Sequence, residues 1–99
     1  MSYLVTLTLD LEDAQSQDYK CLTDQLKELH LENRLRGKSG KYARLPLNTY
    51  ARVINGRNAK DLANGLMRRL DDIFEECDIE GKVLVTVGDF WCWRVKNIS

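Results

Sequence analysis

Strand-like and helix-like periodicity alternate along this chain, and their order constrains its fold more than any other feature. Residues 3–10 alternate apolar and polar side chains, which is typical of a strand with one buried face. Residues 16–31 and 58–76 instead repeat apolar side chains at helical spacing, with charged residues between them. Alternation returns over 48–55 and 82–87 and predicts two more strands.

The stretch between the first helix and the strand at 48–55 is less regular. Residues 33–36 indicate a short strand, and the Gly-Lys-Ser-Gly sequence at 37–40 is typical of a flexible turn or a hairpin tip. Residues 41–45 either pair back or lead away. Pro46 ends any central strand because it cannot donate a backbone hydrogen bond.

With 33–36 as a strand, the order is β-α-β-β-α-β, the pattern of an α+β, ferredoxin-like fold. We expect a single domain over 1–99, with two helices on one face of a four-stranded sheet. Residues 90–95 are a fifth short strand or a packed tail. We further expect the strands at 3–10 and 48–55 to be adjacent and parallel, which would place Asp10 near Arg57.

The cysteines and the single histidine offer little chemistry. Cys21, Cys77 and Cys92 have no CxxC spacing, so we expect buried or half-buried free thiols. His30 follows a helical pattern and suits a capping or solvent-exposed role, which leaves no partner for nucleophilic catalysis or zinc binding. Residues 1–11 lack a basic segment, and no apolar run is long enough for a membrane span. We therefore expect a cytoplasmic protein without a membrane partner.

Charge is distributed unevenly although the whole chain is neutral. Residues 1–32 carry a net charge of −5, residues 33–69 of +9, and residues 70–99 of −4. Arginines prevail in the basic block, and their planar guanidinium groups suit bidentate contact with phosphate. The plainer alternative is that these charges balance acidic helix faces, within the chain or across a dimer.

A basic block over neighbouring strands indicates a nucleic-acid interface. If Ala51 and Val53 face the core, Tyr50 and Arg52 lie on the open face of the sheet, where they could stack on bases and hold phosphates. The expected nucleic-acid-binding residues are Arg34, Arg36, Lys38, Lys41, Arg44, Tyr50 and Arg52.

Asp10 is the first candidate for chemistry because it ends a strand that we expect to lie beside arginines. A carboxylate in that position serves as a metal ligand, a base or one half of an ion pair, or simply forms a turn or cap. Arg52 or Arg57 could stabilise the charge that develops on phosphorus during RNA cleavage. The aromatic residues at 90–93 either pack the tail or form a dimer contact.

Several strings of the sequence resemble the GhoS-type endoribonuclease antitoxins, ferredoxin-like proteins related in fold to a CRISPR-associated adaptation nuclease. The strings lie at 5–10, 44–50 and 85–90. The resemblance implies an enzyme that cleaves the messenger RNA of a membrane-lytic toxin. Asp10 then corresponds to the acid of the first strand, and Lys27 stands where the family has a basic residue on its first helix. In the related nuclease two such acids of a dimer approach a shared metal.

From these observations we expect an RNA-binding protein and, more finely, a sequence-selective endoribonuclease of the antitoxin type. Its catalytic residues would be Asp10, Arg52, Arg57 and Lys27. The sequence leaves the cofactor open between none and Mg²⁺, and a homodimer is the expected assembly. The alternative is a non-enzymatic protein–protein or dimerisation module of the prophage type, which would use Leu4, Ile54 and Leu84 on the open sheet face.

Overall fold

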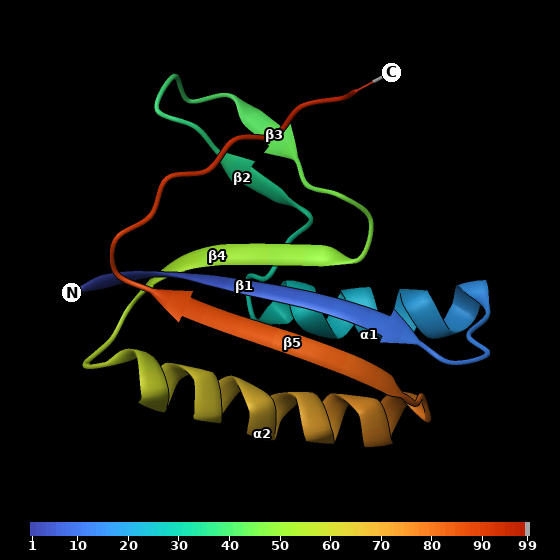
Figure 1. Ribbon diagram of the computed structural model, residues 1–99. Helices are drawn as coiled ribbons and strands as arrows, with labels where there is room; N and C mark the ends of the chain where they lie inside the picture. The colour runs from blue at the N-terminus through green and yellow to red at the C-terminus, as the bar shows by residue number, and fades with distance from the viewer. Residues whose placement is uncertain (99) are drawn as a thin grey trace.

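The computed structural model describes residues 1–98 as an α+β fold in which two sheets are separate (Figure 1). Strand β1 (Ser2–Leu11) is the centre of a three-stranded antiparallel sheet, between β4 (Thr49–Asn55) and β5 (Gly81–Gly88). Strands β2 (Arg34–Arg36) and β3 (Tyr42–Arg44) form a two-stranded hairpin of their own. This hairpin stands beyond the edge strand β4 (Figure 1).

Two amphipathic helices connect these strands. Helix α1 (Ser16–Glu28) follows β1, and it ends three residues before the predicted end because His30 takes a left-handed φ of 61°. Helix α2 (Ala59–Cys77) joins β4 to β5. The Asn58 side chain caps α2 by accepting a hydrogen bond of 2.8 Å from the backbone N–H of Asp61.

Both helices cover the same face of the three-stranded sheet, as the sequence predicts. The odd-numbered residues of β1 point to this face, and with the inner faces of both helices they form one buried cluster. Its centre consists of Val5, Leu7, Leu9, Leu22, Leu26, Leu70 and Ile73. Half-buried Val83, Val85 and Val87 of β5 pack against the cluster. The apolar faces that repeat every two residues on β1 and β5 therefore pack against the apolar faces that repeat every 3.6 residues on the helices.

The expectation of a four-stranded sheet is wrong. The chain beyond α1 pairs with β4 at only one position, the bridge between Glu32 and Ala51. At the next residue the chain turns away, and Asn33 Nδ2 donates to the carbonyl oxygens of Pro46 at 2.8 Å and Thr49 at 2.6 Å. These bonds draw the two ends of the hairpin together. The residues predicted as a second strand therefore pair with β3 instead of β4.

The expectation that the strands at 3–10 and 48–55 run parallel is also wrong. β1 and β4 are antiparallel, with Ser2 opposite Asn55 and Thr8 opposite Thr49. The physical reason is the hairpin, because an intervening reversal of the chain turns β4 against β1. Asp10 and Arg57 therefore lie toward opposite ends of the sheet.

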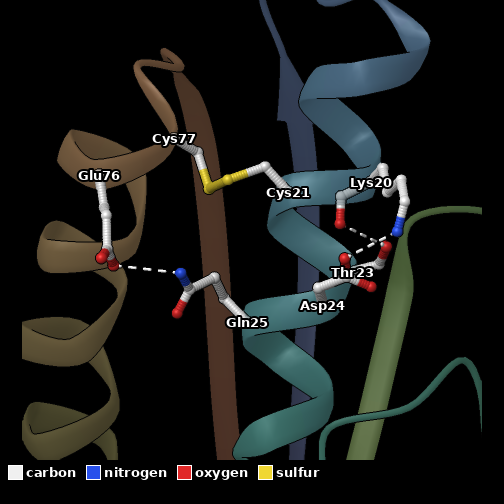
Figure 2. The surroundings of a disulfide bond; sticks show 7 residues. All are labelled: Lys20, Cys21, Thr23, Asp24, Gln25, Glu76 and Cys77. Carbon is white, nitrogen blue, oxygen red and sulfur yellow. Dashed lines mark hydrogen bonds and ion pairs between the residues drawn. A yellow bond between two sulfur atoms is a disulfide. The ribbon is translucent and has the colours of Figure 1, made fainter.

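A disulfide joins the two helices, so the prediction that Cys21 and Cys77 are free thiols is wrong (Figure 2). Their Cα atoms are 5.8 Å apart although 56 positions separate them in sequence, a proximity that only the tertiary fold creates. Beside it, Gln25 Nε2 donates to a carboxylate oxygen of Glu76 at 3.1 Å. Disulfides are rare in reducing compartments, so this bond does not support the cytoplasmic expectation.

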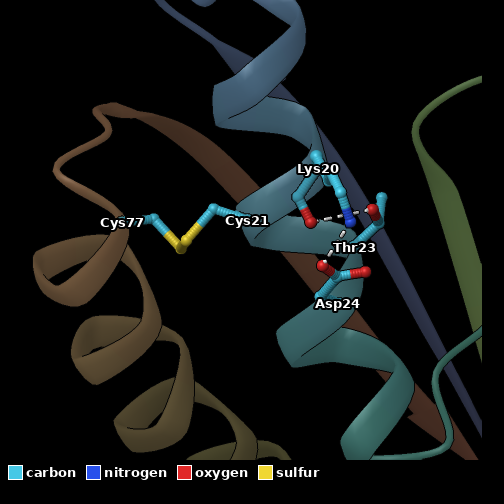
Figure 3. A network of polar contacts seen from close by, with 5 residues as sticks. All are labelled: Lys20, Cys21, Thr23, Asp24 and Cys77. Atoms are coloured by element: carbon cyan, nitrogen blue, oxygen red, sulfur yellow. Dashed lines mark hydrogen bonds and ion pairs between the residues drawn. A yellow bond between two sulfur atoms is a disulfide. The ribbon is translucent and has the colours of Figure 1, made fainter.

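The other face of α1 at this level carries a local polar network (Figure 3). Lys20 Nζ lies 2.9 Å from a carboxylate oxygen of Asp24, one helical turn later. The Thr23 hydroxyl donates to the Lys20 carbonyl oxygen at 3.2 Å. Both charged side chains are largely exposed, and such pairs contribute only a few tenths of a kcal/mol. The network therefore stabilises α1 locally and does not mark a site.

The chain after β5 forms neither helix nor strand over residues 89–98, so it is not a fifth strand, and of the aromatic residues at 90–93 only Trp93 is half-buried. It passes the β2–β3 hairpin (Figure 1), where the Trp93 ring lies 4.0 Å from the position of a β-carbon built on Gly37. Phe90 stays 97% exposed. In the described part of the chain, no helix is long and apolar enough to cross a membrane.

Candidate nucleic-acid interface

The β2–β3 hairpin presents basic side chains on one of its two faces. Its register places Arg34 opposite Arg44 and Arg36 opposite Tyr42, while Leu35 lies opposite Ala43. Residues that are opposite one another share a face, and so do residues two apart on one strand. Three arginines and one tyrosine therefore share one face, and all four are exposed. The other face holds the half-buried Leu35 and Ala43. We call the face with Arg34, Arg36, Tyr42 and Arg44 the arginine face.

The positive charge of the arginine face is hardly neutralised. Arg34 lies 3.5 Å from a carboxylate oxygen of Glu32, and both side chains are substantially exposed. Within residues 1–98, the other bases of the hairpin have no ion-pair partner; they are Arg36, Lys38, Lys41 and Arg44. Like charges directly opposite one another destabilise a strand pair, so the facing arginines cost stability when no anion is bound.

An aromatic ring lies within this charged face. The Arg34 guanidinium is 4.1 Å from the centroid of the Tyr42 ring, a cation–π contact. Tyr42 is 55% exposed, so much of its side chain remains available to a ligand. At the tip of the hairpin, Arg36 Nε donates to the Gly40 carbonyl oxygen at 3.3 Å, and Gly40 takes a left-handed φ of 85°. Tyr42 was missed from the sequence, although its alternation with Arg44 is visible once 41–45 is paired back.

Tyr50 and Arg52, which we expected on the open sheet face, point to the helix face instead. Tyr50 is opposite Leu7 and 7% exposed, and Arg52 is opposite Val5. Burial raises the pKa of the Tyr50 phenol above its ordinary value, and nearby Tyr19 adds to the shift. Each face of β4 carries both apolar and polar residues, so the sequence pattern alone could not show which face the helices cover.

Arg52 is tied to the first helix and is only partly exposed. Its Nη1 donates to the carbonyl oxygen of Leu29, just beyond α1, at 2.9 Å. Its Nε is buried and has no hydrogen-bond partner among residues 1–98. The side chain therefore belongs to the helix layer and is separate from the arginine face.

The structure does not bring the candidate catalytic residues together. Asp10 is exposed near the end of β1, opposite Lys82 of β5. Arg57 follows β4, at the end of the sheet where Ser2 pairs with Asn55, so Asp10 is roughly 26 Å away at strand spacing. Within the described residues, no group of His, Cys, Asp or Glu side chains is arranged to hold a metal ion.

Lys27 and Tyr50 line one cavity near the base of the hairpin. Its volume is about 270 Å³, and its lining also includes Asn33, Leu47 and Asn48. Lys27 is exposed in the last turn of α1, and Leu47 is 88% exposed. This cavity lies beside the two ends of the hairpin, and its lining includes one predicted catalytic residue and one predicted binding residue.

Comparison with known proteins adds no family. The sequence matches no protein-family model and no curated protein. Any assignment of activity therefore depends on the site itself.

Proposed function

We propose that this protein binds single-stranded RNA through the arginine face of the β2–β3 hairpin. The observation that carries the proposal is the register of the hairpin, which places Arg34, Arg36 and Arg44 around the exposed Tyr42. Guanidinium groups bind phosphate through paired hydrogen bonds, and an exposed ring supplies a surface on which a base stacks. A bound phosphate would also relieve the repulsion between Arg34 and Arg44.

The projecting position of the hairpin suits a flexible, single-stranded ligand. The hairpin stands beyond the edge of the sheet (Figure 1). Lys38 and Lys41 lie between its two strands in sequence and extend the positive charge to its tip. Proteins that recognise RNA mostly contact unpaired bases by stacking and hydrogen bonding, because the deep groove of an RNA duplex is too narrow for side chains.

A finer proposal, endoribonuclease activity of the antitoxin type, rests on the resemblance to the GhoS-type proteins. Asp10 would carry the chemistry. Arg57 lies at the other end of the sheet and Arg52 in the helix layer, so neither assists Asp10 within one chain. Cleavage would therefore require basic residues of a second copy or of the RNA-bound hairpin.

The proposal is tested by fluorescence anisotropy with a labelled single-stranded RNA at roughly 50 and 200 mM salt. A variant with Arg34→Gln, Arg36→Gln and Arg44→Gln should lose at least tenfold in affinity. A matched control with Lys60→Gln, Arg68→Gln and Lys82→Gln removes as much exposed charge elsewhere and should bind nearly as well. Equal losses in both variants, or binding that does not weaken with salt, would contradict the proposal. Single-stranded DNA of the same sequence reports whether the 2′-hydroxyl contributes.

The alternative, a protein–protein or dimerisation module, has one observation in its favour. Leu84 is 61% exposed and Val53 48% exposed on the open face of the sheet. They are not neighbours, because the row of Ala51, Thr6 and Thr86 lies between them in the register. Ile54, which we also expected there, lies on the helix face opposite Tyr3. Sedimentation at high salt tests this alternative, since an apolar dimer persists there.

A further inference from the structure

A second cavity opens on the opposite side of the sheet from the open face. It lies among the first half of α2, strands β1 and β4, and the residues that follow α1, and its volume is about 240 Å³. The disulfide between Cys21 and Cys77 joins the helices near the end of α2, so the cavity occupies the end of the helix layer that is not cross-linked. Most of its walls are aliphatic, and the aliphatic residues in its lining are Val5, Leu29, Leu31, Ile54, Leu62 and Leu66.

The charged groups at this cavity are predominantly cationic. Arg52 and Arg69 both line it, and Asp61 is the one acid in the lining. The carboxylate of Asp61 already accepts a hydrogen bond of 3.0 Å from Asn58 at the start of α2. Neither arginine forms an ion pair with any residue from 1 to 98. The cavity thus combines an apolar interior with two arginines that form no ion pair among the described residues.

Arg52 is the group that points to a ligand. The described residues give its guanidinium one hydrogen bond, from Nη1 to the Leu29 carbonyl oxygen, and leave the buried Nε without an acceptor. Buried polar groups are almost always paired in folded proteins, and an exception calls for a missing partner. A carboxylate is the acceptor that best matches a guanidinium, because both are planar and can form two parallel hydrogen bonds.

A second observation about this cavity concerns Gly65, which is one of its lining residues. It lies in the interior of α2, where glycine is less favourable than alanine, and it lines the cavity. A β-carbon built there meets only Arg68 Nη2, at 4.0 Å, so close packing does not require a glycine. Gly56 differs, because a β-carbon there would lie 2.7 Å from Leu62 Cδ1. Position 65 therefore borders the cavity without a side chain, and a larger residue there would find open space.

We propose that this cavity binds a small apolar carboxylic acid, with its hydrocarbon part among the aliphatic walls and its carboxylate at Arg52. The volume is below the roughly 300–1,000 Å³ of sites for drug-sized molecules, so the ligand is a short chain or a single ring. Arg69, at the same cavity, adds positive charge that favours the anion. This site shares no residue with the arginine face, so the proposal does not depend on RNA binding.

Three probes of equal chain length test the proposal on the disulfide-bonded protein: octanoate, octanol and octylamine. Binding is followed by amide chemical shifts in a two-dimensional NMR spectrum. Octanoate should bind saturably and shift the amides of Leu29, Ile54 and Leu66. Octanol should bind at least tenfold more weakly, and octylamine should not bind. Equal binding of octanoate and octanol, or shifts that do not saturate, would overturn the proposal.

Two variants separate the roles of charge and space. Arg52→Gln should weaken octanoate at least tenfold and leave octanol unchanged. Gly65→Leu should fill the cavity and abolish binding of both, whereas Asn64→Leu places the same side chain on an exposed neighbour outside the lining and should bind octanoate normally. Octanoate binding that survives Gly65→Leu would overturn the proposal. If Arg52→Gln fails to fold, the comparison of probes on the unaltered protein and Gly65→Leu still decide the question.

Discussion

Asp10 lies opposite Lys82 across the antiparallel pair of β1 and β5, on the face of the sheet that no helix covers. Both side chains are exposed, so their attraction is screened by water and is worth less than about 1 kcal/mol. We therefore predict that Asp10→Ala and Lys82→Ala each change the free energy of unfolding by less than about 1 kcal/mol, measured by urea denaturation. If the protein cleaves RNA through Asp10, Asp10→Ala abolishes cleavage, with and without Mg²⁺, and Lys82→Ala does not. Equal activity of both variants would remove Asp10 from the proposed chemistry.

The disulfide should be a major source of stability. In the chain-entropy model, a bond that closes a loop across 56 positions stabilises the fold by about 4 kcal/mol. We predict that reduction, or replacement of both Cys21 and Cys77 by alanine, lowers the free energy of unfolding by an amount of this order. Cys92→Ser is the control, since Cys92 is an exposed free thiol. Denaturation midpoints that are identical with and without reductant would show that the bond does not form.

The elements themselves could be predicted from the sequence because each depends on local periodicity. The strand β1 and the apolar stripe of α2 could be predicted without any knowledge of distant residues. The pairing of Cys21 with Cys77 could not be predicted, because it depends on how two helices pack side by side.

The direction of β4 and the face that it buries were harder to predict from the sequence. A strand whose two faces both carry aliphatic and polar residues does not show which face is covered, and a wrong choice moves every side chain to the other side. For this reason Tyr50 and Arg52 were predicted on the open face. The arginines of the hairpin were predicted to bind nucleic acid, and the structure leaves them exposed. Their convergence with Tyr42 depends on the register of β2 and β3.

Two glycines should respond to alanine in opposite directions. Gly65→Ala meets no close neighbour and removes a flexible residue from a helix interior, so it should raise the free energy of unfolding by about 0.5–1 kcal/mol. Gly81→Ala should lower it, because the new methyl group would overlap the backbone carbonyl oxygen of Asp10 and force β1 and β5 apart. Thermal unfolding of the two variants beside the unaltered protein measures both effects. A destabilised Gly65→Ala variant would show that this position is tightly packed.

The arginine face also predicts a change in salt dependence. Each phosphate contact with a single strand contributes about −0.7 to the slope of log affinity against log salt concentration. Arg36→Gln should therefore make the slope shallower by about that amount. Tyr42→Leu should weaken binding while leaving the slope unchanged, because it removes stacking and no charge. Anisotropy titrations over a range of salt concentrations distinguish the two. A slope that changes in Tyr42→Leu and not in Arg36→Gln would contradict this division of roles.

Tyr50 makes stability depend on pH in the alkaline range. Its pKa in the folded protein is raised, mainly because burial disfavours the phenolate. Below the unfolded pKa of about 10 the phenol is neutral in both states, and its full contribution to stability is present. Above that pH the unfolded phenol ionises first, so the free energy of unfolding falls as pH rises, by at most about 1.4 kcal/mol per pH unit for this one proton.

Tyr50→Phe should show a shallower fall than the unaltered protein between pH values of about 9 and 11, in urea denaturation followed by circular dichroism. Tyr42→Phe, which alters an exposed tyrosine, is the matched control and should retain the full pH dependence. Identical pH dependence in Tyr50→Phe and the unaltered protein would mean that the phenolate of Tyr50 is accommodated in the fold without moving to water.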